Sequence, residues 1–156
     1  MKSMIVTLAL GLVVSSQAFA GASNNFIDCS SADGSVKLTG DVPGDFAEFG
    51  LKATVKSKNG GIVPNIDLHS RLNQQTEKEE INGRVAVVDS LEDGVFTIKA
   101  QSTEEFELIQ LFAYPSTVRM NKNGRARAAK FRGKLTLSNE NGVKEAVVNC
   151  TTSYSI

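Results

Sequence analysis

The sequence has no tryptophan, one histidine (His69) and no excess charge of either sign. Without tryptophan it lacks the aromatic platforms on which many sugar-binding clefts are built. A single histidine excludes every site that needs two imidazoles, including multi-histidine zinc and copper centres. The balance of 17 Lys and Arg against 17 Asp and Glu argues against a surface devoted to nucleic acid. Phosphate-cradling glycine loops, nucleophile elbows and paired-cysteine zinc motifs are also missing. We therefore expect no enzymatic activity, no cofactor, no metal site and no nucleic-acid partner.

Residues 1–20 have the layout of a secretory signal peptide. Lys2 supplies an early positive charge, residues 4–14 form an apolar run, and the segment ends in Ala18-Phe19-Ala20. Cleaved signals have this order of charged, apolar and small-residue regions. The apolar run is too short for a membrane anchor, which needs roughly 20 residues. We predict cleavage after Ala20, which leaves residues 21–156 as one β-domain exported to the periplasm or the extracellular space. We expect no stable membrane insertion of this domain.

Two cysteines, Cys29 and Cys150, lie near the two ends of this domain. Cysteines of a small exported domain usually pair, and only one intramolecular pairing is possible here. The bond would close a loop of about 120 residues, for which chain entropy predicts roughly 4–5 kcal/mol of stabilisation. The alternative, a reactive thiol or metal pair, lacks a neighbouring histidine or acidic cluster in the sequence. The sequence therefore predicts a structural disulfide that joins the first strand to the last.

Apolar and polar residues alternate through most of the domain. In residues 47–57, Phe49 and Leu51 fall on the apolar face while charged residues fall on the other, as in a half-buried strand. Asn-Gly and Asp-Gly pairs separate several alternating segments and favour tight hairpins. Residues 106–114 are apolar on both faces, which predicts a central strand buried on both sides. Residues 70–80 are polar and charged, and we expect a short helix or a long loop there.

Eight or nine such strands joined by hairpins predict an all-β fold. The two architectures that fit are a single antiparallel β-sandwich and a small β-barrel. Pairing of the first strand with the last through the disulfide is compatible with both, so the sequence leaves this choice open.

The clearest candidate site is a basic stretch that contains seven Lys and Arg residues and no acidic residue. Its members are Arg119, Lys122, Arg125, Arg127, Lys130, Arg132 and Lys134. Alternation places Lys130, Arg132 and Lys134 in a row on one strand face, and with Arg119 they are the candidate binding residues. Such a row fits phosphate, an acidic glycan or an acidic protein surface. A solvated outer face or a charge-protected edge strand would give the same pattern. Only Phe131 interleaves with the row, and it points to the core, which disfavours nucleic acid.

Two further patterns are weaker. Residues 77–107 are rich in Asp and Glu, so the chain has an acidic middle and a basic later third. Their spacing matches no calcium loop, and they either neutralise the basic stretch across strands or form a docking patch. Asp67 and His69 share a strand face, but this pairing is too common to define a catalytic site.

Three functions fit this pattern. We expect an exported, non-enzymatic β-domain that binds a protein or an anionic envelope polymer, and one form of this hypothesis, by fold analogy, is a hydrolase inhibitor. An alternative is a carrier of a small apolar ligand, in which Phe49, Leu51, Phe96 and Phe131 line a cavity rather than fill the core. A third is an eight-stranded outer-membrane barrel, which has the same alternation but normally also an aromatic girdle.

Overall fold

The computed structural model describes residues 25–42, 48–57, 64–123 and 126–155. These residues form eleven β-strands and two single-turn 3-10 helices. The elements are β1 (Asn25–Ser31), β2 (Val36–Val42), β3 (Phe49–Val55), β4 (Ile66–Asn73), β5 (Lys78–Ile81), β6 (Gly83–Ser90), η1 (Leu91–Asp93), β7 (Val95–Ser102), β8 (Leu108–Ala113), η2 (Pro115–Thr117), β9 (Arg119–Asn123), β10 (Ala126–Asn139) and β11 (Gly142–Ser155). The predicted signal peptide, residues 1–20, lies outside the described residues. Neither of the helices in the described part of the chain is long and apolar enough to cross a membrane.

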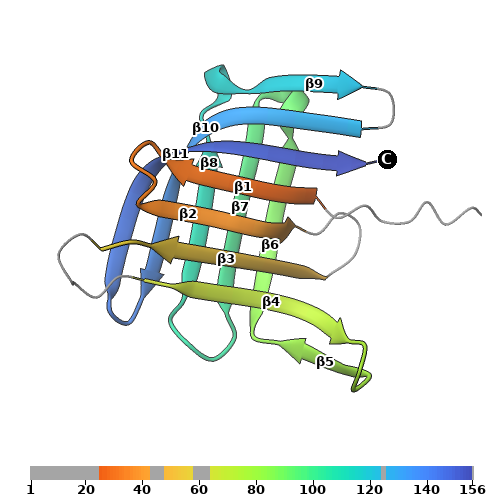
Figure 1. Cartoon of the computed structure of the whole chain (residues 1–156), viewed down its shortest axis with the longest axis vertical. Coiled ribbons are helices and arrows are strands. Elements are labelled where there is room, and N and C mark those ends of the chain that lie inside the picture. Colours follow the sequence, from red (N-terminus) through yellow and green to blue (C-terminus); the bar gives the residue numbers. More distant parts are fainter. Residues whose placement is uncertain (1–24, 43–47, 58–63, 124–125, 156) are drawn as a thin grey trace, which may run out of the picture.

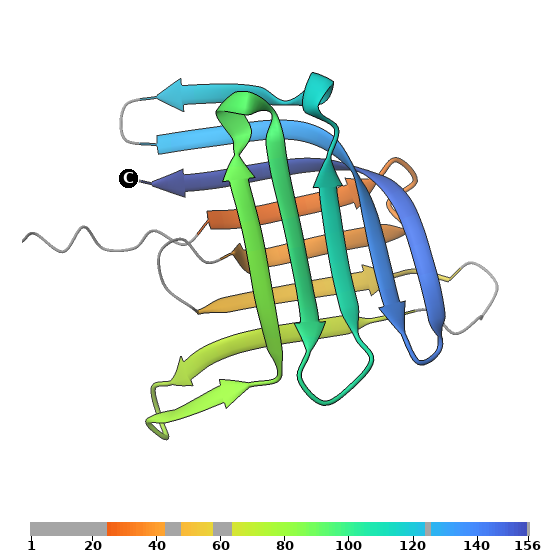
Figure 2. The same cartoon turned by 180° about the vertical axis from the view of Figure 1, so that it is seen from behind.

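All eleven strands belong to one antiparallel sheet that curls over itself into a half-barrel. The strand order is β5-β4-β3-β2-β1-β11-β10-β8-β7-β6, and β9 pairs with the first part of β10. Figure 1 shows β1 to β4 running across the molecule in front of β6, β7 and β8, which run crosswise behind them. We call β1 to β5 and β9, with the adjoining halves of β10 and β11, the front layer. The back layer is β6, β7 and β8 with the hairpin halves of β10 and β11 (Figure 2).

The two longest strands, β10 and β11, connect the layers because each is 14 residues long. Along one edge, β10 pairs first with β9 and then, from Gly133 onward, with β8. A Cβ atom at Gly133 would lie 2.5 Å from the carbonyl oxygen of Phe112, so the close approach of β8 requires glycine here. The change of partner at Gly133 is therefore the corner at which the front layer becomes the back layer.

The predicted all-β antiparallel fold is confirmed, but the described chain has eleven strands where eight or nine were expected. The additional strands are β5 and β9, which are short and lie at edges of the sheet. Both are polar, and no side chain of β5 is fully buried. Their sequences therefore lack the regular alternation of apolar and polar residues by which a strand is recognised.

Residues 70–80 form neither the helix nor the long loop that was expected. The strand β4 continues to Asn73, and after a tight turn the chain returns in β5. The Asn73 side chain organises this turn, because its Oδ1 accepts hydrogen bonds from the backbone N–H groups of Gln75 (2.9 Å) and Thr76 (3.2 Å). Its Nδ2 donates to Glu80 Oε1 at 2.6 Å. Asparagine bonds of this kind favour a turn over a continuing helix.

The expectation of a strand buried on both faces at residues 106–114 is wrong. In β8, Ile109 and Leu111 are buried, whereas Phe112 is 42% exposed on the opposite face. Phe106 precedes the strand and is 93% exposed. The reason is that no other element of the described chain covers the outer face of the back layer, so apolar character on both sides of this strand does not produce burial on both sides.

The hydrophobic core lies between the two layers. The front layer contributes alternate residues such as Ile27, Leu38 and Leu68, and the back layer contributes residues such as Ile98 and Leu135, all of them fully buried. The four side chains considered as the lining of a ligand cavity are also members of this core: Phe49, Leu51, Phe96 and Phe131. The rings of the last two contact each other, with centroids 5.3 Å apart.

The predicted disulfide between Cys29 and Cys150 is present. The two residues are direct cross-strand partners on β1 and β11, with Cα atoms 4.0 Å apart and a sequence separation of 121. Both side chains are buried in the core. The bond therefore fixes the pairing that brings the beginning and the end of the domain together in the middle of the sheet. A buried disulfide of this kind is compatible with an exported protein.

The sheet edges meet at a second corner, built on Asn82. This residue alone separates β5 from β6. Its Oδ1 accepts from the backbone N–H of His69 at 2.6 Å, and its Nδ2 donates to the carbonyl of Asp67 at 2.8 Å. Its own carbonyl accepts from the Thr103 backbone N–H at 2.9 Å. One side chain and its backbone thus connect β4 to the loop that follows β7.

Candidate binding groove

A groove of about 640 Å³ lies where β9, β10, β11 and β1 meet η2. Three of the four basic residues singled out from the sequence line it: Arg119, Lys130 and Arg132. One carboxylate, Asp28, is also present, so the charged side chains of the lining have a net positive charge of two. The remaining lining residues are Ser30, Ser116, Thr117, Phe131, Asn149, Cys150 and Thr151.

Strand register places the cations together. Lys130 is the direct cross-strand partner of Arg119 on β9 and of Thr151 on β11. Arg132 is the partner of Asn149, two positions along β10 on the same face. The basic side chains are exposed, whereas Phe131 between them points into the core. The groove therefore presents the Arg119–Lys130 pair next to the hydroxyl of Thr151, and Arg132 next to the amide of Asn149, and both neighbours can donate hydrogen bonds.

The wall of the groove is η2, which is bonded to the backbone of Arg132. The backbone N–H of Arg132 donates to Thr117 Oγ1 at 2.9 Å, and the Thr117 hydroxyl donates to the carbonyl of Tyr114 at 2.7 Å. The backbone N–H of Tyr114 in turn donates to the carbonyl of Arg132 at 2.7 Å. This ring of bonds fixes η2 against β10 at the corner where the sheet changes layers.

The side chain of Arg119 is held at the same wall. Its Nη1 donates to the carbonyls of Ser116 at 3.1 Å and Val118 at 2.8 Å. A guanidinium has five N–H donors, so these two contacts do not exhaust it. Because the side chain is already oriented, less conformational entropy is lost when an anion binds to it.

Lys134 does not belong to the groove. It lies beyond the corner on the back layer, and its Nζ is 2.8 Å from Glu145 Oε1. The hydrogen bond and positive charge of Lys134, with a smaller contribution from Thr136, lower the pKa of the Glu145 carboxyl below its ordinary value. Arg125 of the basic stretch lies outside the described residues. The bend in β10 therefore separates Lys134 from Lys130 and Arg132, although the three alternate along one strand.

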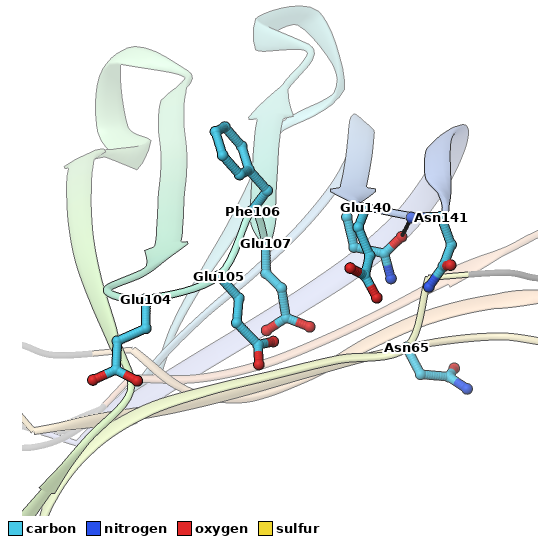
Figure 3. A pocket seen from close by; sticks show the side chains of 8 residues that line it. Asn65, Glu104, Glu105, Phe106, Glu107, Glu140 and Asn141 are labelled. Atoms are coloured by element: carbon cyan, nitrogen blue, oxygen red, sulfur yellow. Dashed lines mark hydrogen bonds between the residues drawn. The ribbon is translucent and has the colours of Figure 1, made fainter.

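A second hollow, of about 450 Å³, is acidic. It is lined by Glu104, Glu105 and Glu107 from the β7–β8 loop, by Glu140 of the β10–β11 turn and by Asn65, which immediately precedes β4. Figure 3 shows the carboxylates of the loop directed toward β4, with the ring of Phe106 turned away from them. Only part of this group was visible in the sequence, because Glu140 is far from the acidic stretch and joins it through the pairing of β8 with β10.

The acidic hollow has an electrostatic consequence for Glu107. Partial burial, and then repulsion from Glu105, Asp67 and Glu140, raise the pKa of this carboxyl above its ordinary value. The arrangement repels anions and does not resemble a metal site. Among the residues that the structure describes, no three His, Cys, Asp or Glu side chains are placed to hold a metal ion.

The contacts of Asp67 and His69 give no support to a catalytic role for this pair. His69 Nδ1 lies 3.7 Å from Asp67 Oδ1, and the same carboxylate is 3.9 Å from Lys52 Nζ. The backbone groups of both residues are bonded to Asn82, as described above. The pair therefore belongs to the corner of the sheet.

Two features of the molecule define its class: a disulfide-closed, two-layered antiparallel half-barrel and a cationic groove at its corner. Comparison with protein families, with curated proteins and with solved structures finds no match for this chain.

Proposed function

We propose that the chain is an exported, non-enzymatic binding domain whose groove at Arg119, Lys130 and Arg132 holds an anionic polymer of the cell envelope. The observation behind this proposal is the convergence of three cations, from two strands, on a groove with one carboxylate. Phosphate or carboxylate groups along a polymer match such a row, because guanidinium groups form paired hydrogen bonds with both.

The distribution of charge supports the same function. The acidic hollow is formed by the β7–β8 loop and the β10–β11 turn, which lie at the opposite end of the molecule from η2 and the groove (Figures 1 and 2). A polyanion approaching the protein is repelled at one end and attracted at the other. The uneven distribution of charge therefore turns the groove toward an approaching polyanion, even though the formal net charge of the chain is zero.

Export is part of the proposal. The signal-like segment at residues 1–20 and the buried disulfide support a destination in the periplasm or outside the cell. A polymer of the envelope would be met in either place. An acidic protein, such as a hydrolase that the domain inhibits, is the second version of the proposal, and it has the same requirement for anionic groups.

A binding experiment with long-chain polyphosphate tests the groove. The variant Arg119→Gln/Lys130→Gln/Arg132→Gln removes its three cations, and Lys56→Gln/Lys78→Gln/Lys144→Gln removes three exposed cations elsewhere. We expect the groove variant to bind at least about tenfold more weakly and to lose about three from the slope of log K against log salt, because fewer counterions are released. The control should retain most of its affinity. Equal losses in both variants would contradict a specific groove.

Poly-L-glutamate separates the two versions of the proposal. Preference for polyphosphate favours the envelope polymer, whereas tighter binding of polyglutamate, lost in the same groove variant, favours an acidic protein.

A further inference from the structure

The loop between β7 and β8 exposes a phenylalanine beside an acidic rim. Phe106 is 93% exposed, more than any other large hydrophobic side chain in the described residues. The acidic residues of this rim are Glu104, Glu105, Glu107 and Glu140. Lys99 of β7 lines an adjoining hollow with the three loop glutamates, so the rim keeps an excess of negative charge. An aromatic ring beside several carboxylates is a surface that a cationic partner can match.

Hydrogen bonds at its base hold this loop in place. The backbone N–H of Ser102 donates to the carbonyl of Glu107 at 3.0 Å, and the N–H of Glu107 donates to Ser102 Oγ at 3.1 Å. The N–H of Thr103 donates to the carbonyl of Asn82 at 2.9 Å. Less conformational entropy is therefore lost when a partner binds the loop. Figure 3 shows the ring of Phe106 and the loop carboxylates on opposite sides of the loop, so a recessed partner surface is needed to contact both.

The cationic groove has the complementary chemistry. The guanidinium groups of Arg119 and Arg132 can form paired hydrogen bonds with carboxylates, and guanidinium groups also stack on aromatic rings. Lys130 adds a third positive charge. The groove is recessed, because η2 forms a wall beside the surface of β10 and β11. It therefore offers a partner for both kinds of side chain that the loop exposes.

The loop and the groove of one molecule lie at its opposite ends (Figures 1 and 2), so they meet only between two copies. An unrelated cationic protein would match the loop's charge, but a second copy is the partner whose matching site the structure itself displays. Groove against groove, or loop against loop, would set like charges against each other. Charge complementarity therefore selects a head-to-tail arrangement of identical chains.

We propose that the β7–β8 loop of one copy docks into the cationic groove of the next copy and competes there with the anionic polymer. The inference rests on the proposed groove but not on the identity of its ligand. Each docked copy keeps one groove and one loop available, so the contact extends into open chains unless its rotation closes a ring. One loop buries a small area, so the association is weak and increases with protein concentration.

Sedimentation equilibrium at low salt, over a series of protein concentrations, tests the proposal on oxidised protein comprising residues 21–156. The loop variant is Glu104→Gln/Glu105→Gln/Phe106→Ser. It is compared with the groove variant of the polyphosphate experiment, which lacks the three groove cations. Polyphosphate binding is measured for each variant in parallel.

The matched control is Leu72→Ser/Glu77→Gln/Glu79→Gln. It removes the same charge and one exposed apolar side chain from the β4–β5 hairpin, which carries none of the residues that line the groove or the acidic hollow. We expect the control to associate like the wild type. A control that associates as weakly as the loop variant would contradict the proposal, because the loss would then be a general effect of charge and apolar surface.

We expect the average mass of the wild type to rise with concentration without stopping at the dimer, and to return to that of a monomer as salt screens the charges. The loop variant and the groove variant should each associate at least about tenfold more weakly than the wild type. The loop variant should bind polyphosphate at least as tightly as the wild type, because its groove is intact.

A mixture of the two variants distinguishes head-to-tail docking from other kinds of association. The loop variant supplies an intact groove, and the groove variant supplies an intact loop. We expect their equimolar mixture to form a heterodimer that grows no further, although each variant alone stays monomeric. A mixture that stays monomeric while the wild type associates would overturn the proposal, because the copies would then meet through other surfaces.

The two proposals fail in different ways. Wild-type protein that is monomeric at every concentration but binds polyphosphate would refute head-to-tail docking and leave the groove function intact. Protein that associates as described but ignores polyphosphate would support head-to-tail docking and contradict the envelope polymer.

Discussion

Arg132 and Thr117 are joined through the backbone N–H of the arginine and the hydroxyl of the threonine, 2.9 Å apart, at the corner where β10 leaves the front layer. They are 15 residues apart in the sequence and belong to different elements. Their bond positions η2 as a wall beside the cations of β10, and the groove depends on this wall.

Removal of the Thr117 hydroxyl should therefore weaken both folding and binding. In Thr117→Val the N–H of Arg132 loses its acceptor, which we expect to lower the free energy of unfolding by about 1–2 kcal/mol. Polyphosphate affinity should fall about three- to tenfold because η2 loses its attachment. Urea unfolding and a binding titration measure the two effects. Thr117→Ser keeps the hydroxyl and should recover most of the polyphosphate affinity. If Thr117→Ser binds polyphosphate as weakly as Thr117→Val, this hydrogen bond does not position η2 for binding.

The disulfide should be a major source of stability. Cys29→Ala/Cys150→Ala restores chain entropy to the unfolded state, and we expect the free energy of unfolding to fall by about 3–5 kcal/mol. The hydrogen bonds between β1 and β11 remain, so the far-ultraviolet spectrum of the folded variant should stay β-rich. Urea unfolding of the variant, and of reduced wild-type protein, measures the change. A loss below about 1 kcal/mol in both would mean that the strand pairing needs no covalent bond.

Two neighbouring glycines allow a controlled test of the front layer. Gly40 has φ 148°, and a Cβ there would lie 1.8 Å from the carbonyl oxygen of Gly50 on the next strand. Gly40→Ala should therefore cost about 3 kcal/mol or more, or prevent folding. Gly50→Ala is the control, since a Cβ at that position meets nothing within 4 Å. We expect it to change the unfolding free energy by less than about 1 kcal/mol. Similar losses in the two variants would show that the approach of β2 to β3 is not the cause.

The raised pKa of Glu107 predicts a pH dependence with a definite sign. A carboxyl whose pKa is higher in the folded protein than in the unfolded chain destabilises the fold when it is ionised. This penalty is absent below the ordinary pKa and complete above the raised pKa, so stability falls as pH rises through that window. Glu107→Gln should consequently be more stable than wild type at about pH 7 and equal to it at about pH 3. The difference should stay below about 1 kcal/mol, because solvent screens this partly exposed group.

Thermal or urea unfolding at the two pH values measures the effect. Glu79→Gln serves as the control, since it removes an exposed carboxylate of β5, away from the acidic hollow. If Glu79→Gln gains as much stability at neutral pH as Glu107→Gln does, the cause is a general effect of charge and not local repulsion.

Much of the fold was predictable because burial on one face leaves a period of two in the sequence. The strand around Phe49 and Leu51 and the pairing of Cys29 with Cys150 follow from this period and from the arithmetic of two cysteines. This alternation does not indicate which strands pair with each other. The exchange of β9 for β8 along β10 depends on the close approach at Gly133, and a lone glycine within a strand gives no such information.

The candidate site was predictable only in part for the same reason. Alternation correctly puts Lys130 and Arg132 on one face, but it also puts Lys134 there, and the bend of β10 sends that residue to the back layer beside Glu145. The wall formed by η2, with Thr117 at its end, leaves no periodic signal because it is a single turn. Long-range contacts between loops and strands assemble the groove, and a single sequence does not encode them locally.

The most direct test of the groove is a nuclear magnetic resonance titration of oxidised protein comprising residues 21–156 with polyphosphate. The largest amide shifts should fall on Thr117, Lys130, Arg132, Asn149 and Thr151, while Glu104, Glu105 and Glu107 at the far end stay unchanged. Shifts spread evenly over all exposed lysines and arginines, or no shifts at the corner, would contradict a binding groove there.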